Sequence, residues 1–139
     1  MALTDTQRAQ LGAIADQLIP AGGGMPSASE AGVAGRYLDE VLSSLPDLKA
    51  PLETALAAVD GLAPEAALAV LRDDGAAWGV LTAIIPGAYF MNPAIREAIG
   101  YPGLERRPID ETAKPDYLED GQLASVIARG PVFRPTPTD

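Results

Sequence analysis

Two carboxylates, Asp16 and Asp39, are of the type that could act together as a general acid and a general base. Such a pair needs a short separation and one raised pKa, and the sequence indicates neither. We therefore expect both side chains to lie on solvated helix faces or to hold a loop by hydrogen bonds. Asp73 and Asp74 could contact a divalent cation, but the oxygen-ligand spacing of a calcium loop is absent. We expect a polar helix end there.

Serines are the remaining candidates for a nucleophile, at Ser43, Ser44 and Ser125, and no histidine is present to activate them. Because the sequence contains neither histidine nor cysteine, it lacks the commonest general base, the commonest metal ligand and any disulfide or thiolate site. The residues therefore predict no catalytic, metal or cofactor site in this chain.

Glycines and aromatic residues offer two further possibilities for binding. The run Gly22–Gly24 lacks the lysine and the Ser/Thr of a phosphate-binding loop, and no predicted strand precedes it, so we expect a flexible connection. Trp78, Tyr89 and Tyr101 could stack on a ligand, but aromatic residues at helical spacing more often belong to a core. Tyr101, which precedes Pro102, could equally anchor an interface.

The composition fits one acidic domain with a modest core. The chain has 139 residues, of which 47% are hydrophobic, but many of these are Ala, and each Ala buries little area. We infer that another chain completes part of the apolar surface. The formal net charge of −9 argues against binding to nucleic acid or to an anionic membrane surface.

The elements that must position these residues are predicted to be helices, and the central one spans residues 76–85. This run is almost entirely apolar, which is typical of a helix inside a bundle, and its length is about half of what a membrane crossing needs. Pro86 should kink or end it. Asn92 and Pro93 should then begin a short helix that Gly100 ends.

Capping residues and apolar spacing predict four earlier helices, at about 4–20, 27–45, 47–60 and 64–74. No segment before Tyr101 alternates apolar and polar residues over the length of a strand. The fold class is therefore predicted as all-α, with residues 1–103 forming an irregular bundle of about five to six helices.

Residues 104–139 are predicted to form an extended C-terminal arm. From Tyr101 onward the chain holds six of its thirteen prolines, interspersed with small apolar islands. A long segment without helical periodicity is unusual inside a compact domain, and a disordered tail usually has fewer apolar residues. We expect the arm to lie on a partner protein, with Leu118, Ile127 and Phe133 inserted into separate pockets.

Several short motifs also occur in the order found in a known family. They are Asp16–Pro20, Ser29–Val33, Tyr37–Asp39, Gly87–Tyr89, Asn92-Pro93 and Gly100–Gly103. Together they resemble the gluconate 2-dehydrogenase subunit 3 family, whose members are small subunits that accompany flavin-dependent oxidoreductases of the glucose–methanol–choline type. The resemblance covers most of residues 4–103.

The resemblance implies a non-catalytic accessory subunit. In that family the large subunit carries FAD and oxidises a sugar or another alcohol, and a cytochrome often takes the electrons. The resemblance therefore implies a large flavoprotein as the partner and a cytochrome c subunit as a further candidate partner. The small subunit stabilises the large one. For this chain, the resemblance implies that the residues in contact with the large subunit include Tyr89, Tyr101, Pro102 and Gly103. FAD is expected in the partner, and no cofactor is expected in this chain.

The resemblance also bears on where the protein acts, because many members of the family supply a twin-arginine export signal. No such leader precedes Leu3, which predicts a cytoplasmic chain as written, and a periplasmic one if a leader has been removed. We expect no direct membrane insertion. Two other functions stay open: a stand-alone enzyme or small-molecule carrier with a pocket near Trp78 and Tyr89, and an assembly chaperone that leaves its client.

Overall fold

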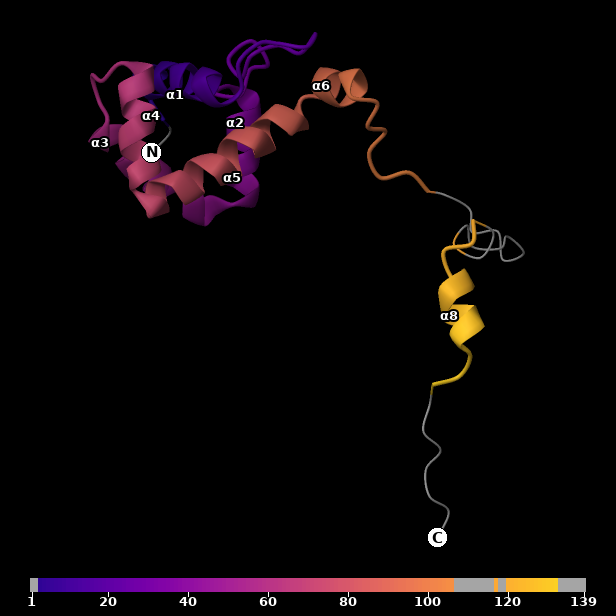
Figure 1. Ribbon diagram of the computed structural model, residues 1–139. Coiled ribbons are helices and arrows are strands. Elements are labelled where there is room, and N and C mark those ends of the chain that lie inside the picture. Colours follow the sequence, from indigo (N-terminus) through magenta and orange to yellow (C-terminus); the bar gives the residue numbers. More distant parts are fainter. Residues whose placement is uncertain (1–2, 107–116, 118–119, 133–139) are drawn as a thin grey trace. The chain divides into compact units, whose positions relative to one another are not determined.

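The computed structural model describes residues 3–106, 117 and 120–132, and these form helices joined by turns (Figure 1). No strand occurs among them apart from one isolated bridge in a turn, so the all-α class is confirmed. The chain divides into two units, Met1–Leu104 and Glu105–Asp139. In chain order the elements are α1 (Asp5–Leu18), α2 (Arg36–Ser44), the 3-10 helix η1 (Pro46–Leu48), α3 (Lys49–Ala58), α4 (Pro64–Asp73), α5 (Gly75–Met91), α6 (Pro93–Ala98) and α8 (Ala124–Arg129).

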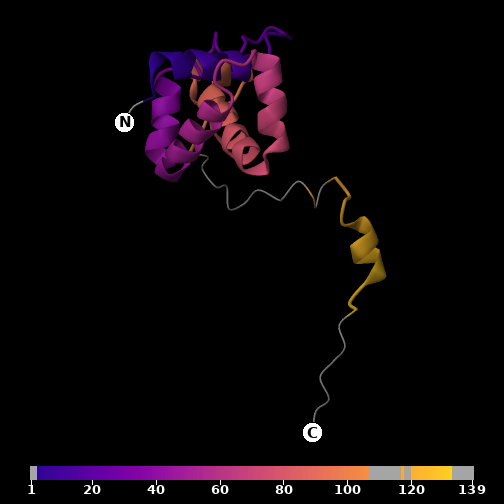
Figure 2. The ribbon, with the colours of Figure 1, turned by 90° about the vertical axis from the view of Figure 1, so that its left-hand side faces the viewer.

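The helix α5 is the one around which the first unit is built. It contacts α2, α3, α4 and α6, while α1 lies across one end of the other helices (Figure 2). Leu81, Ile84 and Ile85 of α5 are completely buried, as the apolar run predicts. One edge of the helix is nevertheless exposed, and it carries small residues such as Gly79 and Ala83.

Pro86 does not end α5, which corrects one of the two outcomes expected from the sequence. The helix continues to Met91 although proline removes one backbone donor. The last turn is held by packing: a Cβ atom on Gly87 would lie 3.6 Å from Cγ2 of Val41 on α2, and Ala88 is completely buried. Tertiary contacts therefore outweigh the local cost of the proline.

The beginning of α2 differs from the prediction for a different reason. The expected capping box does form, because the amide of Ser27 donates to Oε2 of Glu30 at 2.8 Å and the amide of Glu30 donates to Oγ of Ser27 at 3.4 Å. Gly32 then takes a φ of +77°, which a right-handed helix does not contain. The box consequently begins only a turn, and α2 starts at Arg36.

The beginning and the end of α6 confirm the prediction from the sequence. Oδ1 of Asn92 accepts a hydrogen bond from the amide of Ala94 at 2.9 Å, and Pro93 occupies the first position of α6. Gly100 follows with a φ of +69°, as a left-handed helix terminator requires.

The second unit contains a short helix that the proline count did not predict. The helix α8 lies between Gly121 and Gly130, which have φ values of +76° and +69°. Pro131 follows the helix rather than interrupting it, so the prolines of this segment are compatible with one turn and a half of helix.

Ending the chain after Gly103 should leave the first unit folded. The buried apolar residues of the described chain run from Leu3 to Ile95, so the truncation removes none of them. We expect the far-ultraviolet circular dichroism to change only by the small contribution of α8, and the thermal midpoint to stay the same. Loss of the cooperative unfolding transition would contradict the division into two units.

Candidate functional site

The connection between α1 and α2, residues 19–35, is held against the bundle by side chains from several helices, and we refer to it as the clamped loop. Its tip is a tight turn in which Gly22 and Met25 exchange backbone hydrogen bonds of 3.0 and 2.9 Å. Gly23 and Gly24 have φ values of +58° and +82°, as in a type I′ turn. The glycines thus form a defined turn rather than the flexible connection expected from the sequence.

Asp16 of α1 holds the middle of the clamped loop. Its Oδ1 accepts from the amide of Ser29 at 2.7 Å, and its Oδ2 accepts from the hydroxyl of Ser29 at 2.6 Å. Partial burial raises the pKa of Asp16, but hydrogen bonds from Ser29 and Ser27 outweigh it and lower the pKa below its ordinary value of 3.8. Asp16 is therefore an ionised anchor, which is the loop-holding role that we had expected as one of two alternatives.

Tyr89 of α5 and Asn92 at the start of α6 hold two more points of the clamped loop. The hydroxyl of Tyr89 donates to the carbonyl oxygen of Pro26 at 2.8 Å, and Nδ2 of Asn92 donates to the carbonyl oxygen of Ala31 at 2.9 Å. Tyr89 is only 3% exposed. It belongs to the core, which corrects its assignment to a partner-facing surface.

Arg8 of α1 joins the end of the clamped loop to α2. Its Nη1 donates to the carbonyl oxygens of Ala34 and Gly35 at 2.9 and 3.3 Å, and its Nη2 donates to Oδ1 of Asp39 at 2.6 Å. Asp39 therefore pairs with a cation, whereas Asp16 binds the backbone and hydroxyl of Ser29. The two carboxylates have different partners and do not form an acid–base pair.

Residues far apart in the sequence thus meet around the clamped loop. Asp16, Asp39, Tyr89 and Asn92 belong to four of the motifs on which the family resemblance is based, and each makes a hydrogen bond to the chain itself. Sequence reasoning singled out these residues, and for Asp16 and Asp39 it gave loop-holding as one alternative, but it did not predict which groups they bind. Arg8, which it did not single out, is one of only five basic residues in the acidic first unit, and no local pattern indicates its partners.

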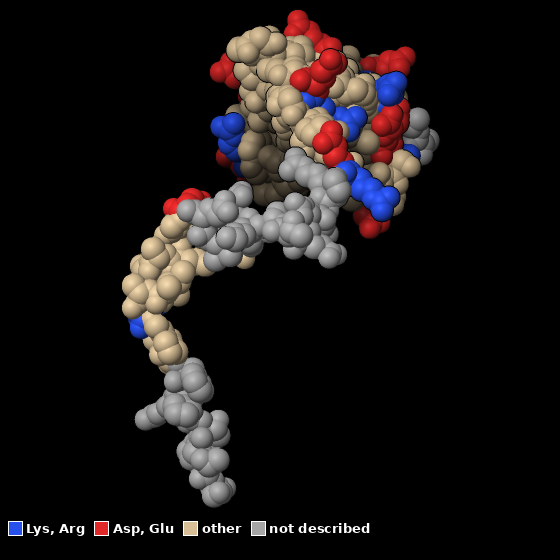
Figure 3. All heavy atoms as spheres, turned by 90° about the vertical axis from the view of Figure 1, so that its right-hand side faces the viewer, with Lys and Arg blue, Asp and Glu red and all other residues tan. Residues whose placement is uncertain are grey.

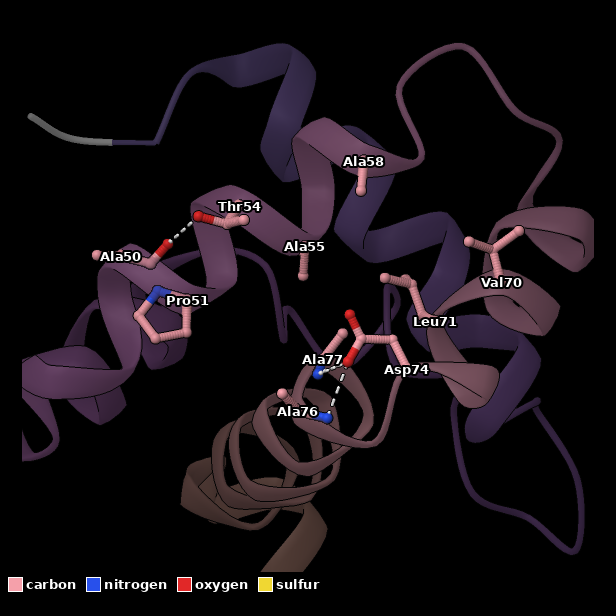
Figure 4. Close-up of a pocket in the computed structure, with 10 residues that line it drawn as sticks. All are labelled: Ala50, Pro51, Thr54, Ala55, Ala58, Val70, Leu71, Asp74, Ala76 and Ala77. Atoms are coloured by element: carbon pink, nitrogen blue, oxygen red, sulfur yellow. Dashed lines mark hydrogen bonds between the residues drawn. The ribbon is translucent and has the colours of Figure 1, made fainter.

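A cleft of about 360 Å³ lies between α3, α4 and α5 (Figure 4). Asp74 is the one charged residue of its lining, and its Oδ1 accepts from the amides of Ala76 and Ala77 at 2.9 and 3.2 Å. Asp74 is therefore the N-cap of α5, as expected of a polar helix end. The cleft offers apolar contact, and its lining consists of Ala50, Pro51, Thr54, Ala55, Ala58, Val70, Leu71, Asp74, Ala76 and Ala77.

The ligand pocket predicted near Trp78 and Tyr89 does not coincide with this cleft, since neither residue lines it. Trp78 is partly buried, and the guanidinium carbon of Arg72 lies 5.2 Å from the centre of its ring. The two aromatic side chains are therefore engaged elsewhere, Trp78 with a cation and Tyr89 with the clamped loop.

The other residues assigned to a partner-facing surface are more accessible where the structure describes them. Tyr101 is 53% exposed, Pro102 is exposed, and Ile127 on α8 is 69% exposed. Gly103 is partly buried and has a φ of +85°. Contact of these residues with a partner stays a prediction, and Leu118 and Phe133 lie outside the described residues.

Charged side chains of both signs are interspersed on the face of the first unit seen in Figure 3, without a basic patch of the kind that nucleic acid attracts. Within the described ranges, no group of three or more Asp or Glu gathers as metal ligands would. No helix in the same part of the chain combines the length and the apolar character needed to cross a membrane.

Comparison with family models, with characterised proteins and with solved structures found no match to this chain. The resemblance to the gluconate 2-dehydrogenase subunit 3 family therefore stays a prediction based on the sequence motifs. The structure adds that residues from several of these motifs converge on the clamped loop.

Replacing Asp16 with Asn should destabilise the first unit by about 1 to 2 kcal/mol at neutral pH, because one charge-assisted hydrogen bond is lost and the other weakened. The folded-state pKa of Asp16 is lowered, so its stabilising contribution is complete above pH 3.8 and declines as the pH falls through the folded value. Urea unfolding of both proteins between pH 7 and pH 2.5 should show the difference shrink at acidic pH.

Asp60→Asn is the matched control, because Asp60 is exposed at the end of α3 and no side-chain hydrogen bond involves it among the described residues. It should leave the free energy of unfolding nearly unchanged at every pH. Equal stabilities of the Asp16→Asn variant and the native chain at pH 7 would contradict the anchoring role of Asp16.

Proposed function

We propose that this chain is a non-catalytic accessory subunit that binds and stabilises a flavin-dependent sugar or alcohol dehydrogenase. The observation that carries the proposal is the structural role of the residues in the motifs that resemble the family. Their polar atoms are bonded to the chain itself and shape the clamped loop, instead of pointing at a common point where a substrate could react. Residues used in this way hold the fold together, and a stable fold that presents a preformed surface is what an accessory subunit needs.

Exposed apolar side chains at the end of the first unit support the proposal that the chain binds another protein. Phe90 is 49% exposed, Ile99 is 51% exposed and Tyr101 is 53% exposed, and all three lie within twelve positions of one another around α6. Aromatic and aliphatic side chains exposed on neighbouring turns are typical of interaction surfaces. In the second unit, Val126 and Ile127 on α8 are exposed as well, so each unit offers its own contact to a partner.

FAD would belong to the partner subunit under this proposal, and electrons would pass from it to an acceptor such as a cytochrome c subunit. This chain would contribute stability and surface only. Its own charge fits that role, because a net charge of −9 favours solubility of the free subunit before assembly.

The cleft between α3, α4 and α5 supports a second candidate, a small-molecule carrier. Its volume of about 360 Å³ lies near the lower end of the range for ligand sites. A carrier would bind an apolar ligand through Leu71, Val70 and the surrounding alanines, with Asp74 at the edge. Retention of such a ligand by the purified chain, detected by mass spectrometry of a denatured sample, would favour the carrier.

Co-expression with a large flavoprotein of the glucose–methanol–choline type, where one is encoded beside this chain, tests the proposal directly. We expect the two to co-purify in a fixed ratio, with the flavin on the large subunit, and we expect the large subunit expressed alone to be less soluble and less loaded with flavin. The isolated chain should neither bind FAD nor oxidise sugars.

Two results would contradict the accessory-subunit proposal. A stoichiometric yellow chromophore on the isolated chain would make it a flavoprotein itself. A large subunit that is fully stable and active without this chain would remove the need for it, whereas a chain that promotes flavin loading and then dissociates would be an assembly chaperone.

A further inference from the structure

The exposed edge of α5 is free of charge in a chain of which 21% is charged. Ala76, Gly79, Ala83 and Phe90 are exposed along this edge, and Pro86 is partly buried. These five residues recur in steps of three and four positions, which is the spacing of residues that face a neighbouring helix. A helix that is apolar on every side is normally covered on every side. This edge therefore calls for a partner that the first unit does not supply.

Gly79 indicates how closely that partner approaches. Glycine destabilises the interior of a helix relative to alanine, so it needs a reason there. A Cβ atom on Gly87 would lie 3.6 Å from Val41, whereas a Cβ atom on Gly79 would have no described atom within 4 Å. Packing within the first unit therefore explains Gly87 but not Gly79. A glycine at an exposed helix position permits another backbone to come close.

The two ends of the exposed edge are complementary in shape. At one end, the ring of Phe90 is 49% exposed and lies edge-to-face with the ring of Tyr89, with 5.4 Å between the ring centres. At the other end, Ala76 lines the apolar cleft of about 360 Å³ between α3, α4 and α5 (Figure 4). A dry cavity of about 150 Å³ can hold a benzene ring, so the cleft has room for a phenylalanine side chain. Phe90 and Ala76 lie at equal distances in sequence on either side of Ala83.

We propose that two copies of this chain associate through α5 in antiparallel orientation, with Ala83 at the two-fold axis and Phe90 of each copy in the cleft of the other. The register follows from the positions in the sequence, because an axis at Ala83 brings each Phe90 opposite Ala76 of the second copy. A symmetric dimer uses the same patch on both copies, so the patch must be self-complementary, as this edge is. The dimer does not depend on the proposed accessory role, and it occupies the cleft that a small-molecule carrier needs.

Charge favours the antiparallel orientation. Asp73 and Asp74 are exposed directly before α5, so parallel helices would place two pairs of carboxylates side by side, which is unfavourable. Two chains of net charge −9 repel each other, and the edge of α5 lets them meet without charged side chains in the contact. Because the contact follows one helix, it should bury less than the roughly 800 Å² per partner of a standard interface, so we expect a weak dimer.

Single cysteines in the full chain test the arrangement, because the chain contains none of its own. Ala83→Cys should form a disulfide-linked dimer on mild oxidation, since a disulfide needs Cα atoms within about 7 Å and the two copies of this position meet at the axis. Ala76→Cys should not, because in the antiparallel pair the two cysteines lie about 21 Å apart along the helices. Ala69→Cys, on an exposed position of α4 outside the cleft, gives the rate of random collision.

Two outcomes of the oxidation experiment would overturn the proposal. Ala83→Cys that forms dimers no faster than Ala69→Cys would exclude a contact at Ala83. Ala76→Cys that forms dimers as fast as Ala83→Cys would exclude the antiparallel register. Because no flavoprotein is present, neither outcome depends on the co-expression test.

Sedimentation equilibrium of the full chain measures the association without cross-linking. We expect a monomer–dimer equilibrium with a Kd between about 10 µM and 1 mM. Phe90→Ala should weaken it about tenfold, because the ring no longer fills the cleft, and Ala58→Leu should weaken it by filling the cleft from within. Leu62→Ala is the matched control, since Leu62 is 44% exposed but lies between α3 and α4.

All variants should keep the circular dichroism spectrum of the native chain, because the replaced side chains are exposed. A native chain that stays monomeric up to about 1 mM would overturn the dimer. A Kd that is unchanged in both Phe90→Ala and Ala58→Leu would overturn the insertion of Phe90 into the cleft.

Discussion

The connection between α1 and α2 imposes the constraint on which the rest of the first unit depends. Ala28 and Val33 of the clamped loop are completely buried although they lie in no helix. Backbone groups that enter a core must find hydrogen-bond partners there. Local bonds from the Ala28 amide to Ile19 and from the Val33 amide to Ala28, both 3.0 Å, satisfy part of this need. Side chains from α1, α5 and α6 supply the rest.

This requirement explains features of α5 that its own sequence does not explain. Tyr89 can reach the carbonyl oxygen of Pro26 only because the helix continues beyond Pro86. Asn92 both caps α6 through Oδ1 and holds Ala31 through Nδ2, so the short turn between α5 and α6 has a fixed geometry. The buried helix, the clamped loop and the exposed end of α6 therefore form one structural unit, and a partner that binds near Tyr101 would meet a preformed surface.

Local features of this fold could be predicted from the sequence, and distant ones could not. The capping box of Thr4 and Gln7, the start of α6 at Asn92 and the left-handed Gly100 all follow from neighbouring residues. The continuation of α5 depends instead on contacts with α2, more than forty positions earlier. The burial of Nε of Arg96 without a hydrogen-bond partner among the described residues depends on how the chain packs around it, which no local pattern encodes.

Hydrogen exchange of the clamped loop tests the central claim most directly. The amide of Ser29 donates to Asp16, and the amides of Ala28 and Val33 donate to the backbone carbonyls of Ile19 and Ala28. If the loop is held as described, these three amides exchange orders of magnitude more slowly than the same sequence in a free peptide, at rates close to those of the α5 core. Exchange at the rate of the free peptide would contradict the account, because the loop would then be neither clamped nor part of the core.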